Sequence, residues 1–538
     1  MRAALVPKGQ TAGRFETPEG QLMLPMGFEA HIPEDDMVRF FARELKGLDY
    51  RGLYVAYSSP PYSKGPGRPP TDPRLLFQVC AYAYALDIYS SRKIEEACRK
   101  RIDFMWLLNG APAPDHTTIA IFRSGPCKDA IEDLFYQYVR RLDEIGATDH
   151  EVGMIDGTKI ESVANRYTFV WRKSAEKNLA CLPEKVKAAF ERLGIEGEAT
   201  LATLRHAVRG LRREMAEKKV VCVHGKGCRK TQLQRDLEAL DGLLTRWATY
   251  EDQLLVMGPD RNSYSKTDPD ATFMRMKDDH MRNGQLKPAY NVQFCTNSEF
   301  VTGIKVFSER NDVNTLKPFM ETLAERHGKD YEATSTDAGY ESLENYRFLD
   351  GRNIESFIKP VTYEQMKTKK FKGQIGRREN MVYVEEGDYY VCANLERLVF
   401  SGEHTFAPKN GVKQTNRVYR CVSCEGCTLR RECCKSKDAS TPKEIEVNRE
   451  FVAYRERSLK NITSSHGIRI RVNRSIQAEG TFGVIKQDHH FRRFLCRGKK
   501  KVASELFLLG MGHNIRKHYR KSMDGRLDDH LFRVKKAV

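Results

Sequence analysis

The spacing of apolar residues divides the chain into a helical first part and a mixed second part. In the first part, apolar positions recur every three or four residues, which is typical of helices that bury one face. Thr71 or Asp72 can cap one of these helices, with Pro73 in its first turn, and Asp115 can cap another. The predicted helices cover Met37–Leu45, Arg74–Leu86, Ser91–Arg101, His116–Arg123 and Ala130–Ile145.

Short apolar runs predict β-strands in the second part. The run Glu151–Asp156 predicts a buried strand, followed by a turn at Gly157 and a second strand. Strand and helix patterns then alternate, which predicts a mixed α/β sheet of roughly five strands. Further strands are expected at Tyr290–Cys295, Phe300–Phe307, Tyr331–Thr336 and Ile354–Ile358, and helices at Val313–His327 and Gly339–Leu349.

Two long segments interrupt this sheet. Residues 172–255 are highly charged and keep helical spacing, so we expect an inserted helical arm. Residues 361–460 are polar and contain short strand-like pieces, which indicates a β-rich insertion. Helical spacing covers Glu450–Leu459, Val472–Lys486 and Val502–Tyr519.

Composition excludes several classes of protein. Of the 538 residues, 90 are Lys or Arg and 72 are Asp or Glu, and the formal net charge of +18 favours a polyanionic partner such as nucleic acid. No apolar run approaches the roughly 18 residues of a membrane span, and the first residues lack a secretory pattern. Most of the 14 cysteines are scattered singly, which suits a reduced compartment. We therefore expect a cytoplasmic protein without a membrane partner.

The predicted helix Ser91–Arg101 has a basic face. It carries Arg92, Lys93, Arg99, Lys100 and Arg101. Short helices of this kind around a tight turn suit a helix-turn-helix-like DNA-binding domain. A helical bundle with a solvated basic rim explains the same pattern, so both interpretations remain open.

Three acids are candidates for metal-dependent chemistry. Asp156 and Asp337 each end a short apolar strand, and such carboxylates can share two Mg²⁺ ions roughly 4 Å apart for phosphoryl transfer. Glu479 on a later helix can close the site, and Lys486 and Arg474 on that helix can hold a phosphate. The alternative is that the aspartates are ordinary turn residues and that Glu479 is a solvated helix position.

Segments around these acids resemble the DDE transposases of bacterial insertion sequences, specifically the IS1182 group among the IS4/IS5-like transposases. Ile155–Ser174, Thr336–Ser342 and Asn473–Gly498 carry the resemblance, and each contains one of the three acids. Asp268–Asp278 and Gly67–Gln78 are also similar to that group, the latter to its N-terminal helical domain. The similar segments follow one another in the same order over most of the chain.

The resemblance implies a ribonuclease-H-like mixed-sheet core that binds two Mg²⁺ or Mn²⁺ ions. The E-x₆-K signature of the family matches Glu479 and Lys486. The family's arginine usually lies four residues before the glutamate, whereas this chain has Ser475 there and Arg474 one residue earlier. The implied DDE triad consists of Asp156, Asp337 and Glu479.

Five cysteines lie between positions 421 and 434, and the first three are separated by two residues each. In an intracellular chain, this spacing indicates metal ligands in preference to disulfide bonds. Four thiolates suit tetrahedral Zn²⁺, with Cys434 as a competing ligand or a spare, and Cys392 could enter from the preceding strand. A structural zinc would hold together an insertion that lacks its own core, and the alternative is a reduced, unligated loop. The four expected ligands are Cys421, Cys424, Cys427 and Cys433.

The densest basic stretch follows Glu479 along the chain. Because it is adjacent to the candidate catalytic acid, contact with DNA phosphates is a better explanation than a merely solvated face. The expected phosphate and DNA contacts are Lys486, Arg474, Arg492, Arg493, Lys499 and Lys500.

The resemblance and the patterns together predict six parts. The fold class is α/β, with a ribonuclease-H-like core, an N-terminal helical domain, a helical insertion and a β-rich, zinc-containing insertion. The expected parts are an N-terminal arm (1–30), a helical DNA-binding domain (31–125), a catalytic core (126–171, 256–360 and 461–520), the helical insertion (172–255), the β-rich insertion (361–460) and a basic tail (521–538).

The function that this implies is a DNA transposase. It would bind the terminal inverted repeats of its own element as double-stranded DNA, cleave there and join the 3′-hydroxyl end to target DNA. A homodimer or higher multimer is expected because two element ends must be joined. Two alternatives are a nuclease of the same fold without strand transfer and a non-catalytic, zinc-containing DNA-binding protein.

Overall fold

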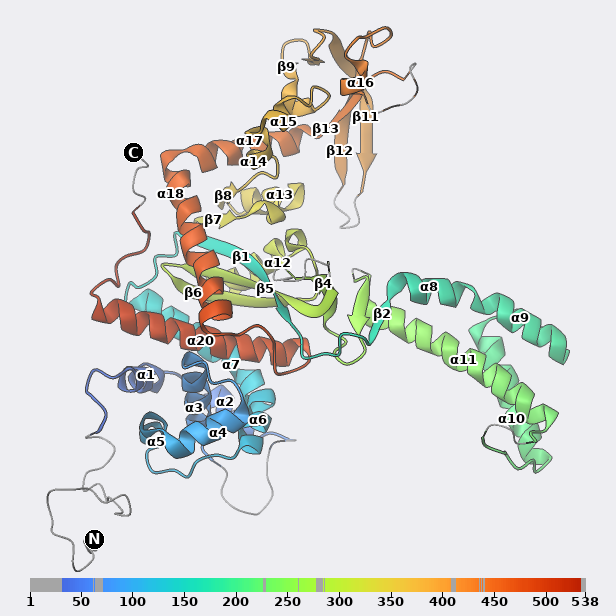
Figure 1. Ribbon diagram of the computed structural model, residues 1–538, viewed down its shortest axis with the longest axis horizontal. Helices are drawn as coiled ribbons and strands as arrows, with labels where there is room; N and C mark the ends of the chain where they lie inside the picture. The colour runs from blue at the N-terminus through green and yellow to red at the C-terminus, as the bar shows by residue number, and fades with distance from the viewer. Residues whose placement is uncertain are drawn as a thin grey trace, which may run out of the picture. The chain divides into compact units, whose positions relative to one another are not determined.

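The computed structural model describes most of the chain and divides it into two compact units (Figure 1). One unit is Met1–Leu142 with Ser504–Leu527, and the other is Asp143–Ala503 with Asp528–Val538. The predicted arm at 1–30 and the last residues of the predicted tail lie outside the described residues. The described residues are 31–60, 62, 71–225, 229–259, 261–276, 284, 286–407, 413–434, 436, 438 and 441–533.

The first unit is helical, as the apolar spacing predicts. The carboxylate of Asp72 accepts a hydrogen bond from the backbone N–H of Arg74, and Pro73 occupies the first turn of α3. Asp115 caps α6 in the same way, so both predicted helix starts are confirmed. The helices are α1 (Met37–Lys46), α2 (Arg51–Ser58), α3 (Pro73–Ala85), α4 (Ser91–Lys100), α5 (Ile102–Leu108), α6 (His116–Ser124) and α7 (Pro126–Glu144).

The centre of this unit is completed by the C-terminal part of α20 (Lys499–Met523). Gly512 packs directly against the backbone of Ala85, and the Tyr138 hydroxyl lies 2.8 Å from Nδ1 of His518. The predicted core ended at residue 520, whereas this compact unit takes Ser504–Leu527. Among the described helices, including this long one, none is both long and apolar enough to cross a bilayer.

The second unit is built on a mixed six-stranded sheet, which confirms the α/β prediction and adds one strand to it. The strand order is β4-β5-β1-β7-β8, with β6 also paired to β5. β1 is antiparallel to β5 and parallel to β7, and β7 is parallel to β8. The strands are β1 (Val152–Glu161), β4 (Thr272–Arg275), β5 (Leu286–Asn297), β6 (Phe300–Phe307), β7 (Ala333–Thr336) and β8 (Glu355–Ile358).

The turn predicted at Gly157 is wrong. β1 continues through this residue and pairs with β5 without a break from Met154 to Glu161. A Cβ atom at Gly157 would lie 2.4 Å from Nε2 of Gln293, 2.9 Å from Oδ1 of Asp312 and 3.0 Å from the Tyr340 hydroxyl. The glycine therefore provides close approach for these polar groups and not a reversal of the chain.

Helices cover this sheet and bury its apolar side chains. α12 (Leu316–His327) and α13 (Leu343–Gly351) contribute to a core that includes Ile155 of β1 and Ile358 of β8. After α17 (Arg449–Thr463), the chain continues through α18 (Ser465–Arg474), η5 (Ser475–Glu479), α19 (Gly480–Gly483) and η6 (Val484–Asp488).

Both predicted insertions have the expected secondary structure. The helical insertion has its own apolar core, and a two-stranded ribbon of β2 (Phe169–Trp171) and β3 (Ser263–Ser265) precedes and follows it. Its helices are α8 (Arg172–Ala180), α9 (Leu182–Leu193), α10 (Leu201–Glu217) and α11 (Gln232–Met257). The second insertion is an antiparallel sheet of β9 (Val382–Val384), β10 (Tyr389–Val391), β11 (Arg397–Phe406), β12 (Gln414–Cys421) and β13 (Glu444–Val447).

The packing of Gly512 generates a stability prediction. In Gly512→Ala, the new Cβ would lie 2.8 Å from the backbone nitrogen of Ala85, and backbone cannot move aside cheaply. We expect the free energy of unfolding to fall by about 1–3 kcal/mol, measured by urea denaturation. Gly52→Ala in α2 is the control, because nothing lies within 4 Å of its Cβ and alanine favours helix. Equal stability of Gly512→Ala and Gly52→Ala would contradict the packing.

Candidate functional site

The three predicted catalytic acids line a single cleft of about 330 Å³. Asp156 lies within β1, Asp337 directly follows β7 and Glu479 ends η5. The parallel register pairs Met154 with Ser335, and the same offset continued by two residues brings Asp156 opposite Asp337. Adjacent parallel strands thus explain how two acids far apart in sequence reach one place. Lys486 lines the same cleft.

Arg474 lies between two of these acids. Its Nη2 donates a hydrogen bond of 2.8 Å to Oε1 of Glu479, and its Nη1 lies 3.6 Å from Oδ2 of Asp156. The side chains of Arg474 and Asp156 are only 13% and 10% exposed, so their contact is weakly screened by solvent, whereas Glu479 is half-exposed. The guanidinium therefore offsets part of the repulsion between the carboxylates.

The helix geometry explains the unusual spacing between Arg474 and Glu479. The segment Ser475–Glu479 is a π-helical turn, which adds one residue to the turn. In an α-helix, a residue four positions before the glutamate would lie on the same face. In this π-helical turn, the residue five positions before it, Arg474, takes that place. The hydroxyl of Ser475 also donates to Oε2 of Glu479, at 3.1 Å.

Of the other predicted phosphate contacts, Lys486 lines the cleft and the remaining four lie outside it. Nζ of Lys486 donates to the carbonyl of Lys159 in β1, at 3.1 Å. Arg492 donates to Gln487, and Arg493 donates to the carbonyl of Ser162. Arg492, Arg493, Lys499 and Lys500 are exposed and do not line the cleft.

A fourth carboxylate near the cleft was missed by the sequence analysis. Asp312, in η2 (Asp312–Asn314), accepts hydrogen bonds from the side-chain amides of Asn291, at 2.7 Å, and Gln293, at 3.0 Å. Tyr340 donates to Gln293 from the other side, and burial, followed by the charge of Asp312, raises the pKa of Tyr340 well above its ordinary value. Asp312 stands in a polar loop with no strand-end pattern, so the sequence offered no signal for it.

The predicted zinc ligands gather in the β-rich insertion. Cys421, Cys424, Cys427 and Cys433 line one cavity of about 20 Å³, together with Cys392 and Cys434. The backbone N–H of Lys443 donates to Sγ of Cys424, at 3.3 Å. Burial raises the pKa of the Cys421 thiol to about 12. Among the described residues, no three of these sulfur atoms all lie within 4.8 Å of one another. The thiols therefore share one cavity but are not at the spacing of ligands around one ion.

Two family models match the chain. A model described as "Transposase DDE domain" matches residues 391–519, which include Arg474, Glu479 and Lys486. A model described as "Transposase domain" matches residues 27–125, which include the helices α1 to α6. No curated protein and no solved structure matches the chain.

Asp312 generates a prediction about this site. In Asp312→Ala, the buried amides of Asn291 and Gln293 lose their shared acceptor. We expect the free energy of unfolding to fall by roughly 1–3 kcal/mol in urea denaturation. The control is Asp330→Ala, which removes a carboxylate that pairs with Arg352 at the surface and is expected to cost less than about 1 kcal/mol. If Asp312→Ala cost no more than this control, Asp312 would have no structural role at the cleft.

Proposed function

Because this chain is a DDE transposase of the IS1182 group, as its two transposase domains indicate, we propose that it moves its own element by cutting and joining DNA. It binds the terminal inverted repeats, cleaves double-stranded DNA at the element ends and joins the freed 3′-hydroxyl to target DNA. Both steps are substitutions at a phosphodiester, so one set of acids serves both.

The convergence of Asp156, Asp337 and Glu479 on one cleft is the observation that carries this proposal. Carboxylates that line an accessible cleft beside a lysine are suited to hold cations and a DNA phosphate together. Asp156 and Asp337 are fixed by paired strands, and Glu479 reaches them from a helix.

The strand order supports a ribonuclease-H-like core. The antiparallel strands β6, β5 and β1 are followed across the sheet by β7 and β8, which run parallel to β1. An aspartate in the central strand β1 and another after the neighbouring β7 agree with the DDE arrangement implied by the family resemblance.

The donor set fits two Mg²⁺ or Mn²⁺ ions. Carboxylate oxygens are the ligands that these hard cations prefer, and Asp156, Asp337 and Glu479 would hold them. When bound, the ions would activate the attacking oxygen and stabilise the leaving oxygen. Arg474 offsets part of the charge of Asp156 and Glu479. Cations held by the acids would replace this role, which leaves Arg474 available to a DNA phosphate.

The basic residues outside the cleft suit the DNA backbone. Arg492, Arg493, Lys499 and Lys500 are exposed, and they contribute to the net charge of +18. The basic helix α4 belongs to the domain matched at 27–125, which we assign to DNA binding. Two element ends must be brought together, so a homodimer or higher multimer on DNA is expected.

The cysteines of the β-rich insertion are proposed to hold one structural Zn²⁺. Thiolates are preferred zinc ligands, and Cys421, Cys424, Cys427 and Cys433 face one small cavity. A modest closure of the loop around an ion would complete the site, with Cys434 or Cys392 as the possible replacement for one of the four. No catalytic role is assigned to this ion, because protein ligands would fill its coordination.

Substitution of the acids tests the catalytic proposal. We expect Asp156→Asn, Asp337→Asn and Glu479→Gln each to lower Mg²⁺-dependent cleavage of a duplex carrying the element's own ends by at least about 10⁴-fold. Binding to that duplex, measured by gel shift, should remain. The surface variant Asp330→Asn should cleave like the wild type. Undiminished cleavage by any of the three acid variants would remove that residue from the triad.

A pre-cut element end separates the proposal from its two alternatives. A transposase joins the exposed 3′-hydroxyl of this substrate to a target duplex. A nuclease of the same fold cleaves uncut ends without joining them. A zinc-containing DNA-binding protein binds the duplex and does neither.

Elemental analysis of the purified protein tests the zinc assignment. We expect Cys421→Ser and Cys424→Ser each to lose about one equivalent of zinc, because serine replaces a strong thiolate ligand. Cys222→Ser is the matched control, since Cys222 is exposed in the helical insertion and away from the cluster. Equal zinc content in the wild type and in Cys424→Ser would show that the cluster holds none.

A further inference from the structure

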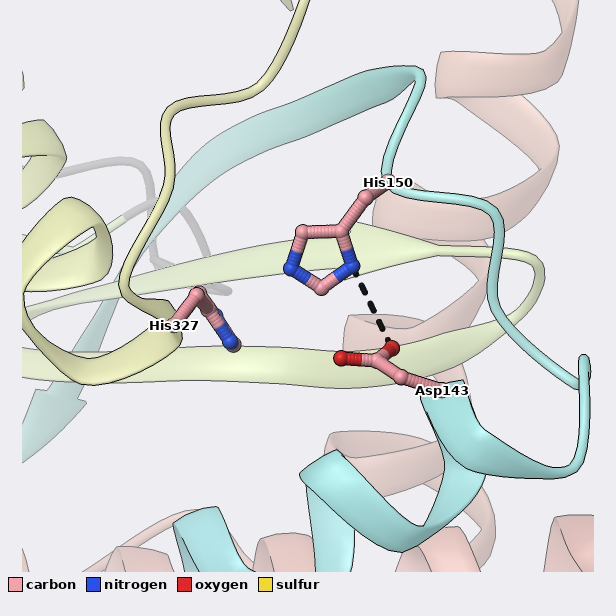
Figure 2. Close-up of side chains that lie close together, drawn as sticks. All are labelled: Asp143, His150 and His327. Carbon is pink, nitrogen blue, oxygen red and sulfur yellow. Dashed lines mark ion pairs between the residues drawn. The ribbon is translucent and has the colours of Figure 1, made fainter.

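A second group of potential metal ligands lies directly before β1. Asp143 near the end of α7, His150 in the following loop and His327 at the end of α12 point toward one another (Figure 2). Each offers one ligand atom, and these atoms all lie within 4.8 Å of one another. Among the described residues, this is the one group of three or more His, Cys, Asp or Glu side chains that meets this distance.

The spacing of two of these ligands is already that of a coordinated ion. Nδ1 of His150 lies 3.2 Å from Oδ1 of Asp143. Ligand bonds of about 2.0–2.2 Å in a tetrahedron place neighbouring donor atoms roughly 3.3 Å apart. The pair therefore needs no rearrangement to share an ion, and only His327 would have to move closer.

His150 lacks the hydrogen bonds that a buried imidazole needs. The residue is 4% exposed, and among the described residues neither ring nitrogen makes a well-aligned hydrogen bond, although Nδ1 lies 3.2 Å from the Asp143 carboxylate. Its ring stacks on Tyr331 at 4.8 Å and meets the edge of His327 at 4.6 Å, which leaves little room for water around it. Buried polar atoms without partners are costly, so a missing ligand is a physical explanation for this ring.

The surroundings orient the other two side chains as metal ligands require. Nε2 of His327 lies 3.1 Å from the carbonyl of Thr302 and donates to it, so that the lone pair of the ring is on Nδ1. The Thr148 hydroxyl donates to the Asp143 carboxylate and fixes its orientation.

We propose that Asp143, His150 and His327 bind one divalent transition-metal ion of the zinc class. Two imidazoles and one carboxylate suit zinc, cobalt or nickel, whereas magnesium prefers oxygen ligands alone. Three protein ligands leave a fourth position, which water can fill from the side of Asp143, whose side chain is 25% exposed. This site is independent of the catalytic acids and of the cysteine cluster.

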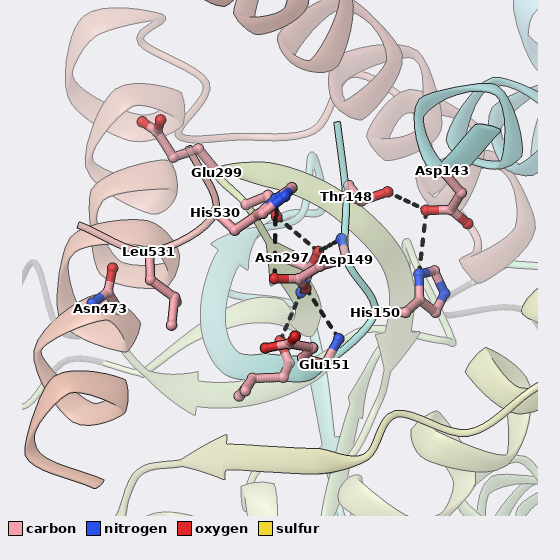
Figure 3. A network of polar contacts seen from close by, with 12 residues as sticks. Asp143, Thr148, Asp149, His150, Glu151, Asn297, Glu299, Asn473, His530 and Leu531 are labelled. Atoms are coloured by element: carbon pink, nitrogen blue, oxygen red, sulfur yellow. Dashed lines mark hydrogen bonds and ion pairs between the residues drawn. The ribbon is translucent and has the colours of Figure 1, made fainter. Parts of the chain in front are cut away.

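The role that the position indicates is structural. The ion would join the segment between α7 and β1 to the end of α12. The same segment is tied to the end of β5, because Asp149 exchanges hydrogen bonds with Asn297, at 3.1 Å and 2.6 Å (Figure 3). β1 begins two residues after His150 and carries Asp156, so the ion would fix the start of the strand that holds a catalytic acid.

Cobalt titration of the full-length, metal-free protein tests this proposal. Excess Mg²⁺ is included to occupy oxygen-only sites. Thiolate ligands give Co²⁺ an intense near-ultraviolet charge-transfer band, whereas nitrogen and oxygen ligands give only visible d–d bands. We expect one equivalent of Co²⁺ to bind and to give visible d–d bands without a near-ultraviolet thiolate band. Any Co²⁺ bound by the cysteines would come in addition and would give that band. Zn²⁺ should displace it.

Variants assign the signal to this site. Asp143→Asn and His327→Gln keep the side-chain size, and each should weaken this equivalent by more than about 100-fold while the thiolate band stays unchanged. His206→Gln is the control, because His206 is exposed on α10, and it should titrate like the wild type. Circular dichroism confirms that each variant is folded.

Two results would overturn the proposal. One is a wild-type protein that takes up no Co²⁺ beyond the thiolate-bound ion. The other is an additional equivalent that both folded variants retain. Neither depends on DNA cleavage, so failure here would leave the transposase proposal intact, and loss of cleavage in Asp156→Asn would leave this site intact.

Discussion

The cleft depends on bringing three carboxylates to one place against their mutual repulsion. The adjacent parallel strands β1 and β7 bring Asp156 and Asp337 together, and a helix brings Glu479 to the same cleft. Carboxylates that line one cleft repel one another, and Arg474 opposes this through contacts with Asp156 and Glu479. The arginine is thereby part of the scaffold of the site as well as a candidate phosphate ligand. The π-helical turn between residues 475 and 479 places Arg474 where it reaches both acids.

The central strand β1 is also constrained by polar side chains that pack closely against it at Gly157. Gly157 has no side chain, and the amide of Gln293 and the carboxylate of Asp312 fill that space. The amides of Asn291 and Gln293 give Asp312 two donors, which compensates the charge that it adds near the acids. A larger residue at position 157 would displace these groups and, with them, the backbone that carries Asp156.

Local patterns predicted much of this structure. The helices of the first unit, both of its cap residues and the β-rich character of the cysteine-containing insertion followed from spacing and turn chemistry. The two aspartates could be named because apolar runs stop at Asp156 and Asp337, although only Asp337 follows the end of a strand and Asp156 lies within β1. The errors arise where tertiary contacts decide the structure. Gly157 was predicted as a turn because the side chains that pack against it come from other strands and loops. Asp312, Asp143 and His327 contact their partners only in the folded chain. No sequence pattern could show that α20 completes the helical unit.

Glu479 differs from the two aspartates in how its position is fixed. Asp156 and Asp337 are held by backbone pairing, whereas the helix that carries Glu479 is held largely by side-chain contacts. Gln477 accepts from the N–H of Glu299 and donates to the carbonyl of His530, and Asn473 exchanges two hydrogen bonds with Phe532. Figure 3 shows His530 beside Asn297, and Leu531 on the side of Asn473. Residues at the end of the chain therefore fasten the third acid to the turn between β5 and β6. Asn297, the last residue of β5 before this turn, binds Asp149, so the segment before β1 and the helix of Glu479 are held at the same end of β5.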